Sequence, residues 1–379
     1  MGERLGIALL VLALQAFAAF LFTRGVRLPG RFHLPVHALF IVMNLPLPYV
    51  LWLQAGARQP PLWLAAAVVR PFFAWQSSWF TFSLFFGISI GLTRLAVLVT
   101  GYDGLLTFIR GLAVGAAGFW TALAVAGLIG TVKAPEVTRV KITLPGLRPA
   151  DRGVRVALLS DVHVAWWNSK SEIDRIGKII ADEKPDLLLV AGDMVDHHPA
   201  YTEAFADALE AVRPRLGRFA VIGNHDVYTG RNEVARRMTA RGIVMLRRTA
   251  ERLDSSGARI TVAGFDDSGQ GWTKWDPASK VIPELVSGLE APIILLAHRP
   301  PPLEGLRGLP PMLILSGHTH GGQVRLPFGG PGLADLTFDY TAGKYRKADQ
   351  TLYVTRGVGH VGWPFRIFCP AEITVIALE

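Results

Sequence analysis

Side chains that can bind metals or transfer protons follow five short apolar runs in the last two thirds of the chain. The first three runs lead into Ser160-Asp161-Val162-His163, Gly192-Asp193-Met194-Val195-Asp196 and Gly223-Asn224-His225-Asp226. The last two lead into His298 and into Ser316-Gly317-His318-Thr319-His320. Taken singly these motifs have little specificity, apart from the moderately specific Gly317-His318-Thr319-His320, but all five in this order indicate one shared site.

The residue types in these motifs indicate that the site binds metal. Several carboxylates brought together must shift their pKa, pair or bind a cation, because like charges at short range oppose joint ionisation. Carboxylate and amide oxygens with imidazole nitrogens, and without thiolates, suit manganese, iron, zinc or a similar divalent ion. The alternation in Asp161-Val162-His163 and His318-Thr319-His320 places two ligands on one side of an extended backbone. Gly192, Gly223 and Gly317 permit the tight turns that such a site needs.

The elements that must position these groups follow an α/β pattern, because after residue 133 short apolar runs alternate with polar, helix-length stretches. Ligands of open α/β sheets bind beyond the carboxyl ends of the strands, so the five motifs are expected to converge on one crevice. Helices are predicted at 171–183, 201–212 and 232–241. Strands are predicted at 154–159, 187–191, 219–222, 259–264, 293–297, 312–315, 352–355 and 373–377.

The first third of the chain is predicted to be a membrane module. Four stretches lack formally charged residues, at 5–23, 32–57, 71–93 and 111–132, and each is long enough to cross a hydrocarbon core about 30 Å thick. Prolines interrupt the second stretch, which would make it kinked or re-entrant. A cleavable signal peptide is the alternative for the first stretch, since Arg4 precedes its apolar core.

An even number of spans would place the N-terminus and the soluble domain on the same side of the membrane. Basic residues flanking the spans divide six to five in favour of a cytoplasmic domain, a margin that one miscounted span would reverse. The chain is therefore expected to be an integral membrane protein. Its predicted parts are a transmembrane module at 1–132, a linker leading into the domain at 133–153 and the α/β domain at 154–379.

Charge and cysteine content argue against two other kinds of protein. The net charge is +9, and +6 of it lies before residue 131 as isolated arginines between apolar runs, which is typical of membrane flanks rather than of nucleic-acid binding. The one cysteine, Cys369, excludes an internal disulfide and a thiolate-rich metal site, and is expected to be a buried structural thiol. The sequence gives no sign of an obligate protein partner.

From 154 to 379 the motif series resembles the calcineurin-like metallophosphoesterase superfamily. The preceding spans and the run Gly317-His318-Thr319-His320-Gly321-Gly322-Gln323 make it similar to the membrane-associated branch, which includes bacterial phosphodiesterases and transmembrane metallophosphoesterase-domain proteins. The resemblance implies an α/β fold, a two-sheet αββα sandwich, and the four charge-free stretches predict a bundle of about four transmembrane helices before it.

The resemblance also implies two divalent metal ions that share one carboxylate. The first ion would be held by Asp161, His163, Asp193 and His320. The second would be held by Asp193, Asn224, His298 and His318.

Other residues around the ions would act on the substrate or support the ligands. The resemblance makes His225 a nearby acid or phosphate contact, oriented by Asp226, and gives Asp196 the role of fixing ligand geometry. Arg299 would be either a phosphate contact or a surface residue. Two such ions imply attack on phosphorus by a hydroxide that bridges them, which would hydrolyse a phosphoester or phosphoanhydride.

Membrane anchoring favours a substrate that carries a lipid-linked phosphate or a nucleotide-lipid pyrophosphate. Trp166, Trp167, Trp272 and Trp275 are hypothesised to form an apolar substrate rim, with packing inside the protein as the alternative. The rival function is a non-catalytic membrane protein whose domain binds metal or a phosphorylated ligand without turnover.

Overall fold

The computed structural model describes residues 2–25, 29–101, 104–254, 257–271, 278–347, 349–362 and 364–379. Contacts divide the chain into two compact units. The first is helical and comprises Met1–Arg58, Trp63–Ile129 and Gly362–Phe365. The second contains both β-sheets and comprises Gln59–Leu62, Gly130–Val361 and Arg366–Glu379.

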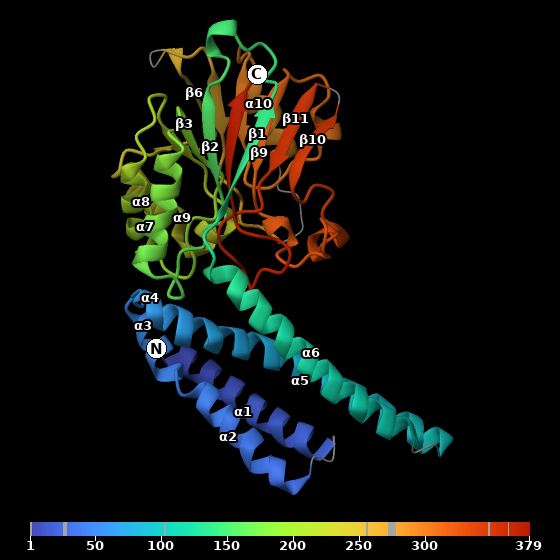
Figure 1. The fold of residues 1–379 in the computed structure, drawn as a ribbon. Helices are drawn as coiled ribbons and strands as arrows, with labels where there is room; N and C mark the ends of the chain where they lie inside the picture. The colour runs from blue at the N-terminus through green and yellow to red at the C-terminus, as the bar shows by residue number, and fades with distance from the viewer. Residues whose placement is uncertain are drawn as a thin grey trace. The chain divides into compact units, whose positions relative to one another are not determined.

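Long apolar helices make up the first unit (Figure 1). The proline-rich stretch is broken as the sequence predicts, because Leu45 and Pro46 separate two shorter helices. A five-residue π-helical segment, Ala65–Val69, leads into the longest helix. The α-helices are α1 (Gly2–Gly25), α2 (His33–Asn44), α3 (Leu47–Ala55), α4 (Leu62–Leu64), α5 (Arg70–Thr100) and α6 (Gly104–Val132).

The described residues contain two helical stretches that are long and apolar enough to cross a membrane, Gly30–Ala55 and Leu106–Thr131. They coincide with the second and fourth predicted spans. Helices α1 and α5 cover the other two predicted spans, and among the described residues of α5 the stretch Phe85–Thr100 forms a shorter apolar helix. Two apolar stretches are thus supported, and the bundle of four spans stays a prediction.

Three carboxamides join α1, α2 and α5. The Gln76 amide donates to Asn44 Oδ1 at 2.5 Å, Asn44 donates to Gln15 Oε1 at 3.3 Å, and Gln15 in turn donates to Gln76 Oε1. Polar side chains in apolar surroundings hold helices together when they satisfy one another. This closed ring therefore stabilises the packing of these three helices.

The second unit contains two six-stranded sheets, each with parallel and antiparallel pairs. The first sheet, in spatial order, consists of β1 (Glu136–Ile142), β12 (Glu372–Leu378), β2 (Arg155–Leu159), β3 (Leu187–Val190), β4 (Arg218–Ala220) and β5 (Val244–Met245). The second consists of β10 (Gly343–Lys347), β11 (Gln350–Val354), β9 (Met312–Ser316), β8 (Ile293–Leu296), β7 (Thr261–Gly264) and β6 (Thr249–Arg252).

All eight strands predicted from the sequence are present, and the four that were missed form the edges of the two sheets. They are β1 and β5 in the first sheet and β10 and β6 in the second. Edge strands have one unpaired side and carry more charged residues than central strands. They therefore lack the continuous apolar run by which the central strands were predicted. Strand β1 lies within the stretch 133–153 that was expected to be a linker.

Helices α7 (Lys170–Asp182), α8 (Tyr201–Ala208) and α9 (Asn224–Thr239) lie together beside β2 and β3 (Figure 1). Helix α7 begins with a capping box between Ser169 and Glu172 and buries Ile173, Ile176 and Ile180, which share one face. Helix α9 begins eight residues earlier than predicted. Its first part holds the Gly-Asn-His-Asp motif, and a break at Gly230, with φ 127°, separates it from the predicted part.

The main core lies between the two sheets, where Val156, Leu158 and Leu189 of the first meet Ile294, Leu296 and Leu313 of the second. A second cluster packs Ile282 and Val286 of α10 (Ala278–Val286) against the other face of the second sheet. The order helix, sheet, sheet, helix confirms the predicted αββα sandwich.

Candidate metal centre

The predicted ligands lie just beyond the carboxyl ends of strands in both sheets. Asp161 follows β2, Asp193 follows β3 and Asn224 begins α9 just after β4. His298 follows β8, and His318 and His320 follow β9. Both sheets therefore contribute to one place at the same end of the sandwich.

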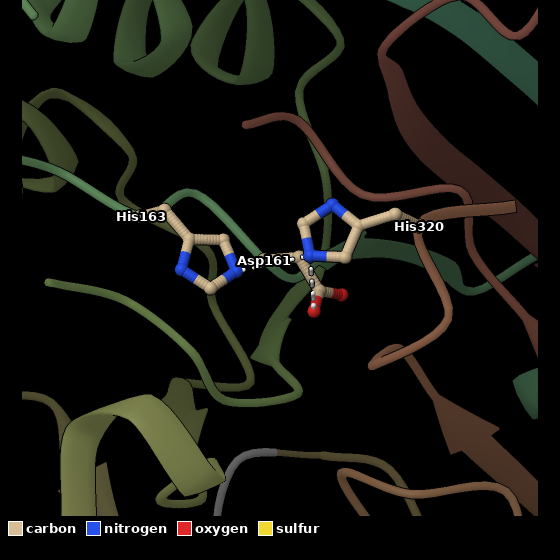
Figure 2. A group of neighbouring side chains, drawn as sticks. All are labelled: Asp161, His163 and His320. Carbon is tan, nitrogen blue, oxygen red and sulfur yellow. Dashed lines mark hydrogen bonds and ion pairs between the residues drawn. The ribbon is translucent and has the colours of Figure 1, made fainter. Parts of the chain in front are cut away.

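The structure brings these side chains together in three overlapping groups of acidic and imidazole residues. Within each group the ligand atoms all lie within 4.8 Å of one another. Figure 2 shows the first group, in which the rings of His163 and His320 point toward each other and the Asp161 carboxylate lies next to the His320 ring. The groups are Asp161, His163 and His320; His163, Asp193 and His225; and Asp193, His298 and His318.

Asp193 belongs to two of the groups, and so does His163. Asn224 joins the last group, since its Oδ1 lies 3.1 Å from His298 Nε2. His225 was expected to act on substrate only, but its ring lies among possible ligand atoms of the second group.

Two of the predicted histidine ligands present the same nitrogen to the cluster. His298 Nδ1 donates to the backbone oxygen of Ala191 at 2.7 Å, which leaves Nε2 facing Asp193 at 3.2 Å. His163 Nδ1 bonds Asp196 at 3.0 Å, and its Nε2 faces His320 Nε2 at 3.0 Å. A metal-binding histidine usually donates its other ring nitrogen to a carboxylate or carbonyl in this way. The donor set therefore fits a metal.

The backbone at the site adopts unusual conformations. Such conformations cost about 1–3 kcal/mol each for non-glycine residues and persist where the surrounding structure holds them, often at functional sites. Gly317 lets the chain approach the first group, because a Cβ there would lie 2.2 Å from Asp161 Oδ2. The predicted ligands with positive φ are Asp161, His163, Asp193, His318 and His320, at 49° to 72°.

Buried charges of both signs shift the pKa values of the cluster. Burial opposes protonation of His163 and His298, but the carboxylates, chiefly Asp196 and Asp193 respectively, raise the pKa of His163 to about 9 and that of His298 to about 10. Burial lowers the pKa of His320 well below its usual value, and the neighbouring His163 adds to this. With these pKa values His163 and His298 carry protons at neutral pH, in a site whose carboxylates favour cations.

Asp196, rather than Asp226, orients His225, so that detail of the expectation is wrong. His225 Nδ1 bonds Asp196 Oδ1 at 2.6 Å, and the other Asp196 oxygen bonds His163. Asp226 instead accepts the backbone N–H groups of Gly223, Met194 and Val195 at 2.9–3.1 Å. One oxygen of Asp226 accepts the N–H of Gly223 and so caps the N-terminus of α9, while the other accepts two N–H groups of the loop after β3, so Asp226 ties that loop to the helix.

Arg299 is buried, so the surface alternative for this residue is wrong. Its side chain is 5% exposed, and its guanidinium bonds both carboxylate oxygens of Asp267, at 2.7 and 3.1 Å. It also donates to the backbone oxygen of Gly271 at 2.7 Å. A buried arginine needs such partners, so Arg299 holds the loop that follows β7.

The structure does not support a substrate rim formed by Trp166 and Trp167. Trp166 and Trp167 are each 4% exposed and their rings pack edge to face, with centroids 5.1 Å apart. They pack inside the protein, as the alternative predicted. Trp272 and Trp275 lie outside the described residues.

Arg366, whose guanidinium lies beside the His320 ring, was not identified from the sequence. Its guanidinium is 4% exposed and donates to the backbone oxygens of Gly359, at 2.5 Å, and of Arg356, at 2.9 Å. It also lies 3.4 Å from the His320 ring. Its hydrogen-bond partners are backbone carbonyl oxygens, which every residue has, so no sequence motif identifies it. Cys369 nearby is 1% exposed, which confirms the predicted buried thiol.

Comparison with known proteins gives matches over the same region. A family model described as calcineurin-like phosphoesterase matches residues 154–322. A transmembrane protein with metallophosphoesterase domain from Danio rerio is 34% identical over 266 residues, which cover 68% of this chain and 60% of that protein. This chain thus spans about 60% of the length of that relative.

Two bacterial relatives are covered more completely. The metallophosphoesterase YkuE of Bacillus subtilis is 31% identical over 60% of this chain and 79% of its own length. The phosphodiesterase YaeI of Escherichia coli is 31% identical over 59% of this chain and 82% of its own length. With its ordered motifs gathered at one end of a two-sheet sandwich, the chain belongs to the calcineurin-like metallophosphoesterase family.

Proposed function

We propose that the chain is a metal-dependent phosphohydrolase with two divalent ions in the cluster. One observation carries the proposal: three groups of acidic and imidazole side chains overlap, and Asp193 belongs to two of them. Two sets of ligands that share a carboxylate favour two ions side by side. The phosphodiesterase relative supports the reaction class.

Each ion would have its own set of ligands. Asp161, His163, Asp193 and His320 would hold the first; Asp193, Asn224, His298 and His318 would hold the second. Oxygen and imidazole donors without thiolate favour manganese, iron or zinc. Bound there, the ions would supply Lewis acidity towards phosphate oxygens and water.

The protein's own groups then orient the substrate and transfer a proton. The His225 side chain is 21% exposed, more than the other members of the cluster described above, so it can reach a substrate. Asp196 fixes the ring through Nδ1, which leaves Nε2 to donate a proton to a leaving oxygen. A positioned acid of this kind contributes roughly a hundredfold to ten-thousandfold.

Hydrolysis of bis(p-nitrophenyl) phosphate by the full chain in detergent tests the proposal. Added manganese should support turnover and EDTA should abolish it. Asp193→Asn and His318→Ala should each abolish turnover while leaving a folded, membrane-inserted protein. Asp182→Asn, on the exposed end of α7, is the matched control and should behave like the unmutated chain.

Full activity in either site variant would refute the metal assignment. A chain that binds manganese in equilibrium dialysis but hydrolyses none of the phosphate esters tested would favour the non-catalytic alternative.

We further propose a lipid-linked phosphate or nucleotide-lipid pyrophosphate as the substrate, four membrane spans and a cytoplasmic catalytic unit. The apolar helices and the transmembrane relative support membrane association. Purified chain should hydrolyse a member of a phospholipid and sugar-nucleotide-lipid panel faster than cyclic nucleotides. Cysteines placed in turn between the helices should react with an impermeant maleimide from alternating sides.

A further inference from the structure

The segment that follows the last histidine motif leaves the site and returns to it. It starts at η7 (His320–Gly322), passes through η8 (Leu333–Leu336) and reaches Phe338. The Phe338 ring packs edge to face against His318, with centroids 5.6 Å apart. Both ends of this segment therefore contact the metal centre.

Large apolar side chains on this segment are exposed to solvent. Phe328 is 105% exposed, Leu336 84% and Leu326 60%, and Phe368 on a neighbouring segment is 63% exposed. We call these four residues the apolar patch. Monomeric soluble proteins rarely gather such side chains on their surface unless the surface binds something.

Hydrogen bonds show that residues 326–331 of this segment form a hairpin. Leu326 N–H donates to the Pro331 oxygen at 2.9 Å, and Gly330 N–H donates to the Pro327 oxygen at 3.3 Å. Phe328 lies in this turn with φ 60°, a conformation that a bulky residue rarely adopts. The turn thus presents Phe328 outward at a conformational cost.

Arg325 fixes the base of the hairpin. Its guanidinium donates to the Gly330 oxygen at 3.1 Å and the Gly321 oxygen at 3.0 Å, and it pairs with Asp335 at 3.2 Å. Its backbone N–H donates to the Ile367 oxygen at 3.0 Å, which brings the neighbouring Phe368 alongside.

We propose that the apolar patch inserts into the interface of the lipid bilayer. Phe and Leu side chains on a rigid turn gain free energy when they leave water for the acyl boundary. A bilayer is the expected partner because the same chain carries apolar helices that are long enough to cross one. Since the segment that carries the hairpin begins at His320 and ends at Phe338 beside His318, insertion of the hairpin would hold the metal centre at the level of lipid phosphates. This consequence rests on the phosphohydrolase function proposed above.

Depth-dependent quenching tests insertion without any need for activity. The full chain, with Phe328→Cys labelled by an environment-sensitive fluorophore, is reconstituted in phosphatidylcholine vesicles that contain spin-labelled lipid. The native Cys369 is buried, and the labelled unmutated chain gives the background. Fluorescence at position 328 should be blue-shifted and quenched. Glu251→Cys, exposed on the opposite edge strand β6, is the control and should show neither effect.

Equal quenching at 328 and 251, or none at 328, would overturn the proposal and leave a protein partner to explain the patch. A second variant, Phe328→Ser with Leu336→Ser, tests the consequence for substrate. Hydrolysis of a phosphodiester lipid in vesicles should fall about tenfold, while that of bis(p-nitrophenyl) phosphate stays unchanged. If the unmutated chain hydrolyses neither compound, the proposed function fails, and the quenching result still decides whether the patch binds lipid.

Discussion

Replacement of Asp196 by asparagine should weaken metal binding and turnover together. Its carboxylate is 11% exposed and accepts a hydrogen bond from His163 Nδ1 at 3.0 Å and from His225 Nδ1 at 2.6 Å. Burial would raise the pKa of Asp196, but the two imidazoles hold it well below its ordinary value. The carboxylate is therefore charged at neutral pH and is bonded to a predicted ligand and to the predicted acid at once.

The size of the effect follows from the loss of that charge. A hydrogen bond to a charged group contributes about 1.5–3 kcal/mol and one between neutral groups about 0.5–1.5 kcal/mol, so each imidazole should lose roughly 1 kcal/mol or more. Residues that support metal ligands typically contribute about 10- to 100-fold to affinity or activity. We expect Asp196→Asn to lower both kcat and the apparent manganese affinity by about that factor.

Manganese titrations of bis(p-nitrophenyl) phosphate hydrolysis, with the full chain in detergent, measure both quantities. Asp182→Asn serves again as the control. A fall in manganese affinity with kcat unchanged would mean that the carboxylate acts through His163 alone. If kcat and affinity both matched those of the control, the reasoning from the two hydrogen bonds would be refuted.

Three further predictions concern the proposed acid His225, the buried Phe205 in the core, and proton release when metal binds. His225→Ala should lower kcat about 10²- to 10⁴-fold for a substrate with an alkoxide leaving group and far less for p-nitrophenolate, which leaves without a proton; an equal loss would argue against the acid role. Phe205→Ala should lower the free energy of unfolding by about 3–5 kcal/mol in urea denaturation followed by circular dichroism, because the ring is 0% exposed; a change below 1 kcal/mol would contradict its core position. With pKa values of about 9 and 10, His163 and His298 hold protons at neutral pH in the metal-free protein, so manganese should release protons in weakly buffered solution and bind more weakly as the pH falls. Binding without proton release would show that these imidazoles are already neutral.

Much of the fold was predictable because central strands are buried on both faces. Strands such as β3 and β8 read as continuous apolar runs with a charged or glycine-rich motif after them, so position and chemistry were visible together. Edge strands such as β1 alternate charged and apolar residues, which made them look like linker. The start of α9 was hidden for a related reason, since its first turn carries the Gly-Asn-His-Asp motif and few apolar residues.

The sequence by itself determined which residues gather, because each motif follows a strand and the carboxyl ends of strands meet at one side of a sandwich. Only the tertiary structure decided how these residues pair. Asp196, rather than the sequence neighbour Asp226, bonds His225, and Arg366 lies beside His320 from 46 residues away. The apolar patch is exposed on and beside a segment whose two ends contact the centre. Local periodicity encodes turns and strands, but the partners of a side chain depend on how two sheets and their loops pack, and that information is spread over the whole domain.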